Sequence, residues 1–218
     1  METTALILIC FWSYFVISFI CFRLEITKIT EAVSRENGFE VLNMRHILGI
    51  IIFSITAYVF FNHSGILLLK NFMEDPALSI SVAFFATISM DLSISDATSQ
   101  NINLQGIPFS MINGFSYIII RLIFLFAYEI FFRGVLFIFS LQYVNLVYAI
   151  FINLFLYALI HGFDSRKEII GSLPFGIVLC MFTYYSGSIW PAFIIHASLS
   201  LGFEAIIISK GLTKIQKS

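Results

Sequence analysis

Three charged side chains lie inside one long apolar run, residues 112–141, where a membrane-spanning helix would offer them no water. A charge at the bilayer centre costs at least about 2.5–3.5 kcal/mol, so such residues are rare and commonly functional. Glu129 and Arg133 are four residues apart and would face each other on one side of a helix, with Arg121 two turns earlier. A buried structural ion pair would also explain this pattern, because a carboxylate compensates the charge of an arginine in lipid.

Polar residues recur at a spacing of four in two later apolar runs: Asn153, Tyr157 and His161 in one, and His196, Ser200 and Glu204 in the other. A single histidine at a helix end is typical of an interface. A single serine in a membrane helix commonly bonds to its own backbone. A histidine, a hydroxyl and a carboxylate on one face of an apolar helix instead favour a functional site.

The three runs together hold two histidines, two carboxylates and two arginines at bilayer depth. This set suits metal binding, activation of water or proton relay. Hydrolysis of an amide needs a base for water, donors for the oxyanion and an acid for the leaving amine, and the set can supply all of these. We expect His161 and His196 to converge in one cavity with Glu129 or Glu204 nearby, because lipid forbids such groups unless they share a pocket.

The composition indicates that these apolar runs lie in a membrane. Of 218 residues, 59% are hydrophobic and 11% are charged, and the mean hydropathy is +0.95. Soluble globular chains have about 45–50% apolar and about 25% charged residues, and a fold of this size cannot hide the difference. The net charge of −1 excludes a basic field for nucleic acid. The three cysteines lie in apolar runs and are interpreted as small hydrophobic residues.

The predicted fold is an all-α polytopic membrane helix bundle with about seven transmembrane helices, in a single domain over residues 1–218. A spanning helix needs about 20 mostly apolar residues. The candidate spans are 5–22, 47–69, 77–90, 112–141, 143–161, 169–186 and 188–209. The third is short enough to be re-entrant. The fourth is too long for one straight crossing, which predicts a tilt, a kink or a protruding end.

The distribution of Lys and Arg predicts the orientation. Nine of the 12 lie in segments on one side of the membrane, namely 23–46, 162–168 and 210–218, whereas the opposite side holds only Lys70. The fourth segment on the basic side, 91–111, contributes none. Positive residues mark the cytoplasmic side, so the N-terminus is predicted outside and the C-terminus inside. We expect an integral protein of a bacterial plasma membrane.

Three short motifs in the second half of the chain resemble those of a known family. Tyr128-Glu-Ile-Phe-Phe-Arg133 is similar to the family pattern Glu-Glu-x-x-x-Arg, Tyr157 to His161 is similar to Phe-x-x-x-His, and His196 to Ser200 is similar to His-x-x-x-Asn. With Trp190-Pro191 ahead of the last motif, their order resembles the CAAX protease and bacteriocin-processing (Rce1/Abi, CPBP) family of intramembrane proteases. The resemblance covers about residues 110–205.

The resemblance implies endoproteolysis inside the membrane. Glu129 and His161 would activate water, His196 would hold the oxyanion, and Ser200 would donate a hydrogen bond in place of the family's Asn. Tyr128, Arg133 and Glu204 would support the site. The cofactor would be none or a single divalent metal such as zinc, with His161, His196 and Glu129 as its candidate ligands.

Tyr128 stands where the family has its leading Glu, and a phenol with a pKa near 10 is no general base at neutral pH. Consecutive helix residues point about 100° apart, so Tyr128 and Glu129 would not both face the site unless the helix is rotated or broken there. Three alternatives remain open. Glu129 has taken over the role of the leading Glu, Glu204 supplies that carboxylate from the last apolar run, or the chain no longer cleaves peptides.

The predicted function is an intramembrane endopeptidase that hydrolyses a peptide bond in a membrane-associated protein or peptide with water activated by Glu and His. One alternative is a catalytically impaired relative that acts as a binding scaffold, in bacteriocin self-immunity or membrane-protein regulation. A second alternative is a proton-coupled carrier, which would also use intramembrane His, Glu and Arg. The predicted partners are the substrate and the lipid bilayer, and no nucleic acid.

Overall fold

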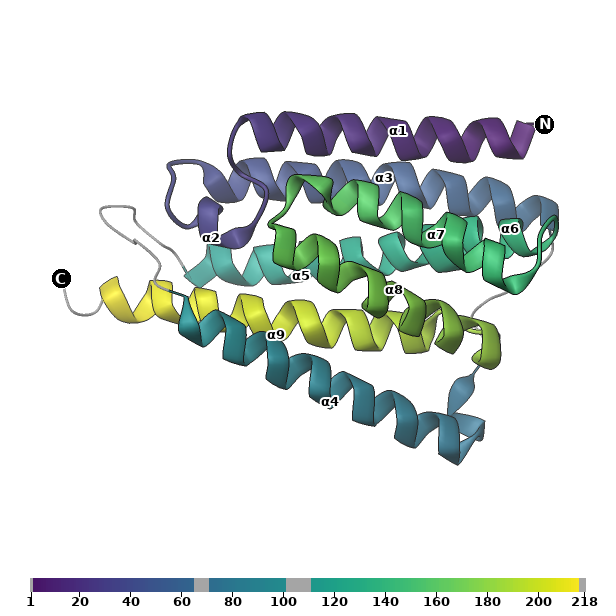
Figure 1. The fold of residues 1–218 in the computed structure, drawn as a ribbon. Coiled ribbons are helices and arrows are strands. Elements are labelled where there is room, and N and C mark those ends of the chain that lie inside the picture. Colours follow the sequence, from purple (N-terminus) through teal and green to yellow (C-terminus); the bar gives the residue numbers. More distant parts are fainter. Residues whose placement is uncertain (1, 65–70, 101–110, 216–218) are drawn as a thin grey trace.

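The computed structural model describes residues 2–64, 71–100 and 111–215, and this part of the chain contains helices and no strand. The long helices lie side by side in one bundle, and spans that follow each other in the chain run in opposite directions (Figure 1). In chain order the elements are α1 (Glu2–Arg23), α2 (Ile29–Ala32), α3 (Gly38–Ser64), the 3₁₀ turn η1 (Phe72–Glu74), α4 (Pro76–Ser99), α5 (Met111–Glu129), the π-helix η2 (Ile130–Phe137), α6 (Ile138–Leu141), α7 (Leu146–Ile160), the 3₁₀ turn η3 (His161–Phe163), α8 (Arg166–Ser186) and α9 (Trp190–Ile215).

Seven stretches of helix in the described residues are long and apolar enough to cross a membrane, which confirms the predicted all-α polytopic bundle. Two predicted boundaries were wrong. The second span begins at Gly38 rather than at residue 47. The third, expected over 77–90 and short enough to be re-entrant, is the 24-residue helix α4, about 36 Å long, which is sufficient for a full crossing.

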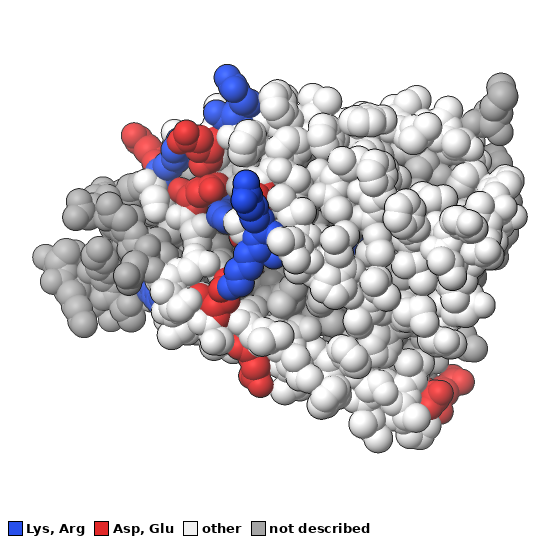
Figure 2. All heavy atoms as spheres, in the orientation of Figure 1, with Lys and Arg blue, Asp and Glu red and all other residues white. Residues whose placement is uncertain are grey.

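Charged side chains gather at one end of the bundle, where α1, α4, α7 and α9 run toward their C-termini (Figures 1 and 2). Ion pairs join separate elements there: Lys28 contacts Glu168 at 3.2 Å, and Lys167 contacts Asp96. The helices alternate in direction, so the predicted basic segments share this end. We call it the charged end; its predicted cytoplasmic location stays a prediction.

The long fourth span changes its winding in the middle. α5 ends at Glu129, and the next eight residues form the π-helix η2, whose members from Phe131 to Phe137 are all buried. Single π segments inside α-helices occur frequently at functional sites. Within the span for which a tilt, a kink or a protruding end was predicted, the helix type therefore changes directly after the carboxylate of the first motif.

The C-terminal half of α4 packs closely on α9. Ser89, Ser93 and Ala97 are buried on one face of α4, at the spacing that lets membrane helices approach each other. Opposite them is Gly202, where a Cβ atom would lie 2.2 Å from the Ser93 hydroxyl oxygen. At the charged end Lys210 donates hydrogen bonds to the carbonyl oxygens of Ala97, Thr98 and Gln100. This packing fixes the position of α9, which carries the last motif.

Candidate active site

A carboxylate held between a histidine and an arginine forms the centre of the bundle. Glu129 Oε1 lies 2.5 Å from His196 Nδ1, and Glu129 Oε2 lies 3.3 Å from Arg133 Nε. Glu129 and Arg133 are fully buried, and the His196 side chain is 9% exposed. The predicted Glu129–Arg133 pair is thus present, and α9 adds His196 to it.

Tyr128 and Glu129 both reach His196, although they are consecutive in the chain. The Tyr128 ring lies 5.9 Å from the His196 ring, centroid to centroid, at 74°. The winding of the helix changes directly after this pair, as described for η2. The Tyr128 hydroxyl oxygen is buried without a hydrogen-bond partner, and its ring packs among Phe53, Phe124 and Phe132. Tyr128 therefore adds an aromatic wall to the centre and no second carboxylate.

Arg133 is positioned by α7 and α8. Its guanidinium carbon lies 4.5 Å from the centroid of the Tyr157 ring, a cation–π distance. A Cβ atom at Gly176 would lie 3.6 Å from Arg133 Nη2, so the missing side chain leaves room for the guanidinium. Asn153 donates a 2.6 Å hydrogen bond to the carbonyl oxygen of Phe132 and accepts one from Cys180, which ties η2 to both helices.

A second polar cluster lies about one turn farther along α9, toward the charged end. Ser200 donates a 2.9 Å hydrogen bond to Glu204, and Arg121 Nε donates to Glu204 at 2.9 Å and to Ser200 at 3.1 Å. Arg121 Nη1 lies 3.2 Å from Nε2 of His46 on α3. The structure thus brings Ser200 and Glu204 to Arg121 and not to Glu129.

His46 was missed by sequence reasoning because it was assigned to a loop. The signal was Asn37-Gly38, a turn dipeptide. Asn37 has φ = 59°, and α3 begins directly after it, which brings His46 into the third turn of a spanning helix.

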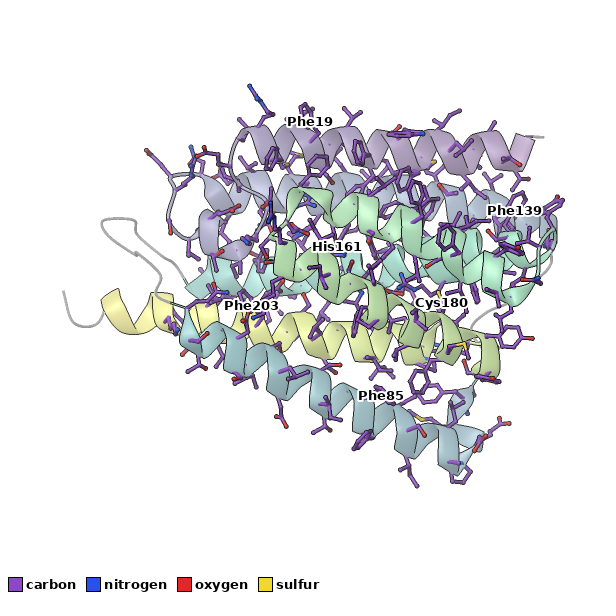
Figure 3. The ribbon with its side chains drawn as sticks, in the orientation of Figure 1. Phe19, Phe85, Phe139, His161, Cys180 and Phe203 are labelled. Carbon is purple, nitrogen blue, oxygen red and sulfur yellow. The ribbon has the colours of Figure 1, made fainter. Side chains whose placement is uncertain are left out.

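His161 takes part in a third contact, near the turn between α7 and α8 (Figure 3). Its Nδ1 lies 2.8 Å from Asp164 Oδ2, and its ring packs 4.8 Å from that of Tyr157, centroid to centroid. Burial raises the pKa of Asp164, but the hydrogen bond from His161, with Arg45 and Lys28 nearby, outweighs burial and holds this pKa below its ordinary value. His161 is linked to the centre through Tyr157, whose ring also packs on Arg133.

The residues present do not fit a metal centre. No group of three or more His, Cys, Asp or Glu side chains is arranged to hold a metal ion in the part of the chain that the structure describes. Of the candidate ligands, Glu129 and His196 bond to each other, whereas His161 bonds to Asp164. Their arrangement suits acid–base chemistry by a carboxylate–histidine pair.

Comparison with protein families agrees with the motifs. The model of the Rce1-like family, described as "Type II CAAX prenyl endopeptidase Rce1-like", matches residues 113–202 and confirms the predicted resemblance. The matched segment contains Glu129, Arg133, His161 and His196, but not His46. No curated protein and no solved structure matches the chain.

Proposed function

We propose, from the Rce1-like domain at residues 113–202, that this integral membrane protein is an intramembrane endopeptidase that cleaves a membrane-associated peptide. The observation that carries the proposal is the 2.5 Å contact between His196 and the buried Glu129. A carboxylate that orients a histidine is the arrangement by which hydrolases prepare a general base.

The contacts and the exposure of Glu129 and His196 favour His196 as the group that activates water. Both oxygens of Glu129 face a partner, and the residue has no exposed surface, whereas His196 keeps some. With Nδ1–H donated to Glu129, the lone pair of His196 Nε2 is available. Nε2 takes a proton from water as the water oxygen attacks the carbonyl carbon of the peptide bond. When the C–N bond breaks, the imidazolium returns that proton to the leaving amine.

The other motif residues support this pair. Arg133 compensates the charge of Glu129, and the Tyr157 ring holds Arg133. His161 forms a second carboxylate–histidine pair with Asp164, its Nε2 has no hydrogen-bond partner, and its ring packs on Tyr157; its expected role in activating water stays a prediction. Ser200, expected to donate to the oxyanion, gives its one O–H to Glu204 and is assigned to holding Arg121.

A binding scaffold is the second candidate function, favoured by one observation. The position of the family's leading carboxylate holds Tyr128, whose hydroxyl is buried and unpartnered. A chain that kept the ion pair but lost the second carboxylate could bind a membrane peptide without cleaving it, as in bacteriocin self-immunity or membrane-protein regulation.

The test uses the full chain in lipid nanodiscs and a fluorogenic, prenylated peptide that ends in a Cys-a-a-X sequence. Cleavage should fall about 10²–10⁴-fold in His196→Gln, the range that a general base contributes. Arg35→Gln is the control, because Arg35 is exposed and pairs with the exposed Glu25. Wild-type activity in a folded His196→Gln variant would overturn the proposed mechanism. Retained peptide binding with no cleavage by the wild type would favour the scaffold.

A further inference from the structure

A hydroxyl without a hydrogen-bond partner lies beside His196, the proposed general base. The Tyr128 ring meets the His196 ring edge-on at 74°, with 5.9 Å between the two ring centroids. The Tyr128 hydroxyl oxygen is buried and has no hydrogen-bond partner. This end of the side chain also lies within electrostatic range of Arg133, Glu129 and Tyr157. The O–H of Tyr128 is therefore a spare donor at the polar centre of the bundle.

The packing around Tyr128 explains its ring but not its hydroxyl. The ring lies against Phe53, Phe124 and Phe132, and the residue is 3% exposed. A phenylalanine would make the same ring contacts. A buried hydroxyl without a partner costs free energy, so such a group in a native structure needs a reason outside the packing.

The winding of the helix directs Tyr128 and Glu129 to the same histidine. Consecutive residues of a regular helix point about 100° apart. Here the π-helix η2 begins directly after Glu129, and both side chains contact His196. Segments of π-helix occur frequently at functional sites. Glu129 thus orients the base, and the preceding residue places a donor beside it.

The other polar side chains near His196 are poorly placed to donate a hydrogen bond there. Ser200 gives its one O–H to a partner within α9. Arg133 has spare N–H groups, but the Glu129 carboxylate turns Oε1 to the histidine and Oε2 to the arginine, and so lies between them. Of the described side chains in hydrogen-bond or ring contact with His196, Tyr128 is the one with a hydrogen to donate.

We propose, on the basis of the peptidase function above, that the Tyr128 hydroxyl donates the hydrogen bond that stabilises the oxyanion. As the water oxygen bonds to the carbonyl carbon, the π electron pair of the C=O bond moves to the carbonyl oxygen, which accepts from Tyr128. When the C–N bond breaks, that pair re-forms C=O, and His196 delivers its proton to the leaving amine. The phenol keeps its own proton throughout, as phenols do at neutral pH. Tyr128 then has a catalytic role different from that of the carboxylate it replaces.

The first test compares Tyr128→Phe with the wild type in lipid nanodiscs, with the fluorogenic prenylated peptide as substrate. Phenylalanine keeps the ring packing and removes only the hydroxyl. We expect kcat to fall about 10²–10³-fold, the loss that follows removal of one oxyanion donor, with KM little changed. The free energy of unfolding should not fall. Tyr148→Phe, which removes an exposed hydroxyl on α7, is the control and should keep the wild-type kcat.

A second measurement does not depend on turnover. One peptide analogue carries a tetrahedral phosphinate in place of the scissile amide, and a matched analogue carries a –CH₂–CH₂– unit, which offers no oxygen to Tyr128. The wild type should bind the phosphinate more tightly than the matched analogue. Tyr128→Phe should reduce that preference about tenfold, the equivalent of one hydrogen bond to a charged group.

The two measurements separate the oxyanion donor from the proposed peptidase. Wild-type kcat in a folded Tyr128→Phe variant would overturn the donor role and leave the peptidase standing. A lower kcat with an unchanged preference for the phosphinate would also overturn it. If the wild type cleaves no peptide, the peptidase fails. The donor role then stands only if Tyr128→Phe still lowers the preference for the phosphinate, and it falls otherwise.

Discussion

The ion pair at the centre of the bundle makes a quantitative prediction for Glu129→Gln. The two charged groups approach to 3.3 Å and are fully buried. At an effective dielectric constant of about 20, their Coulomb attraction is about 5 kcal/mol. Losing one partner leaves Arg133 as an uncompensated buried charge, which commonly costs about 3–5 kcal/mol. We expect Glu129→Gln to lower the free energy of unfolding by that amount.

The double variant Glu129→Gln/Arg133→Met separates the charge from the loss of contacts. It removes both ions and keeps side chains of similar length, so most of the lost stability should return. The assay is reversible unfolding of the purified chain in mixed detergent micelles, titrated with SDS. Glu36→Gln, at an exposed position, is the control and should stay within about 0.5 kcal/mol of the wild type.

Two results would refute this reasoning. A loss below about 1 kcal/mol in Glu129→Gln would mean that Arg133 does not depend on this carboxylate. A double variant no more stable than Glu129→Gln alone would mean that the loss came from packing or from the His196 contact, and not from an unpaired guanidinium.

Three further predictions concern the surroundings of this centre. Tyr128→Phe removes a buried, unpartnered hydroxyl and should keep stability at or up to about 1 kcal/mol above the wild type in the same SDS titration; a clear loss would reveal a hidden partner. Gly171→Ala should raise the free energy of unfolding by up to about 1 kcal/mol through helix propensity, because the space around its Cβ is open. Gly176→Ala should raise it less, because its Cβ would approach a leucine methyl to 2.6 Å. Equal gains in the two variants would contradict the assigned crowding. The lowered pKa of Asp164 means that its charged contact with His161 stabilises the fold above the ordinary pKa of about 3.9 and is lost as the pH falls through the lower folded-state value. The free energy of unfolding should therefore fall less steeply below about pH 4 in Asp164→Asn than in the wild type, measured by unfolding at pH values from 6 to 3.

Hydropathy predicted the seven spans because apolar length is what a bilayer requires. It misplaced the start of α3, since Glu40, Arg45 and His46 lower the local hydropathy although all three are helical. The buried Arg45 and His46 have hydrogen-bond partners inside the protein. Pairing inside the protein shields a charge from the membrane, and a hydropathy profile does not take that pairing into account.

Contacts within one helix were also predictable, and contacts between helices were not. Glu129–Arg133 and Ser200–Glu204 are both four residues apart, so helical periodicity alone brings each pair together. The expected convergence of the two histidines depended on the depth and rotation of separate helices. His196 contacts Glu129, and His161 contacts Asp164, a residue in the turn that follows α7. A cavity shared by the two histidines stays a prediction.

The contacts between α5 and α9 nevertheless follow from the need to pair charged side chains inside a membrane. α5 and α9 are antiparallel (Figure 1), and the ion pairs Arg121–Glu204 and Glu129–His196 join them. In each helix the two partners are eight residues apart, about 12 Å along the axis, so one alignment satisfies both contacts together. A slip by one turn would separate both pairs and leave charges unpartnered in lipid. Apolar side chains distinguish registers poorly in a membrane, because lipid is as apolar as they are. The polar stripe of α9 therefore sets the register of the bundle, and the same register holds the Glu129–His196 pair together.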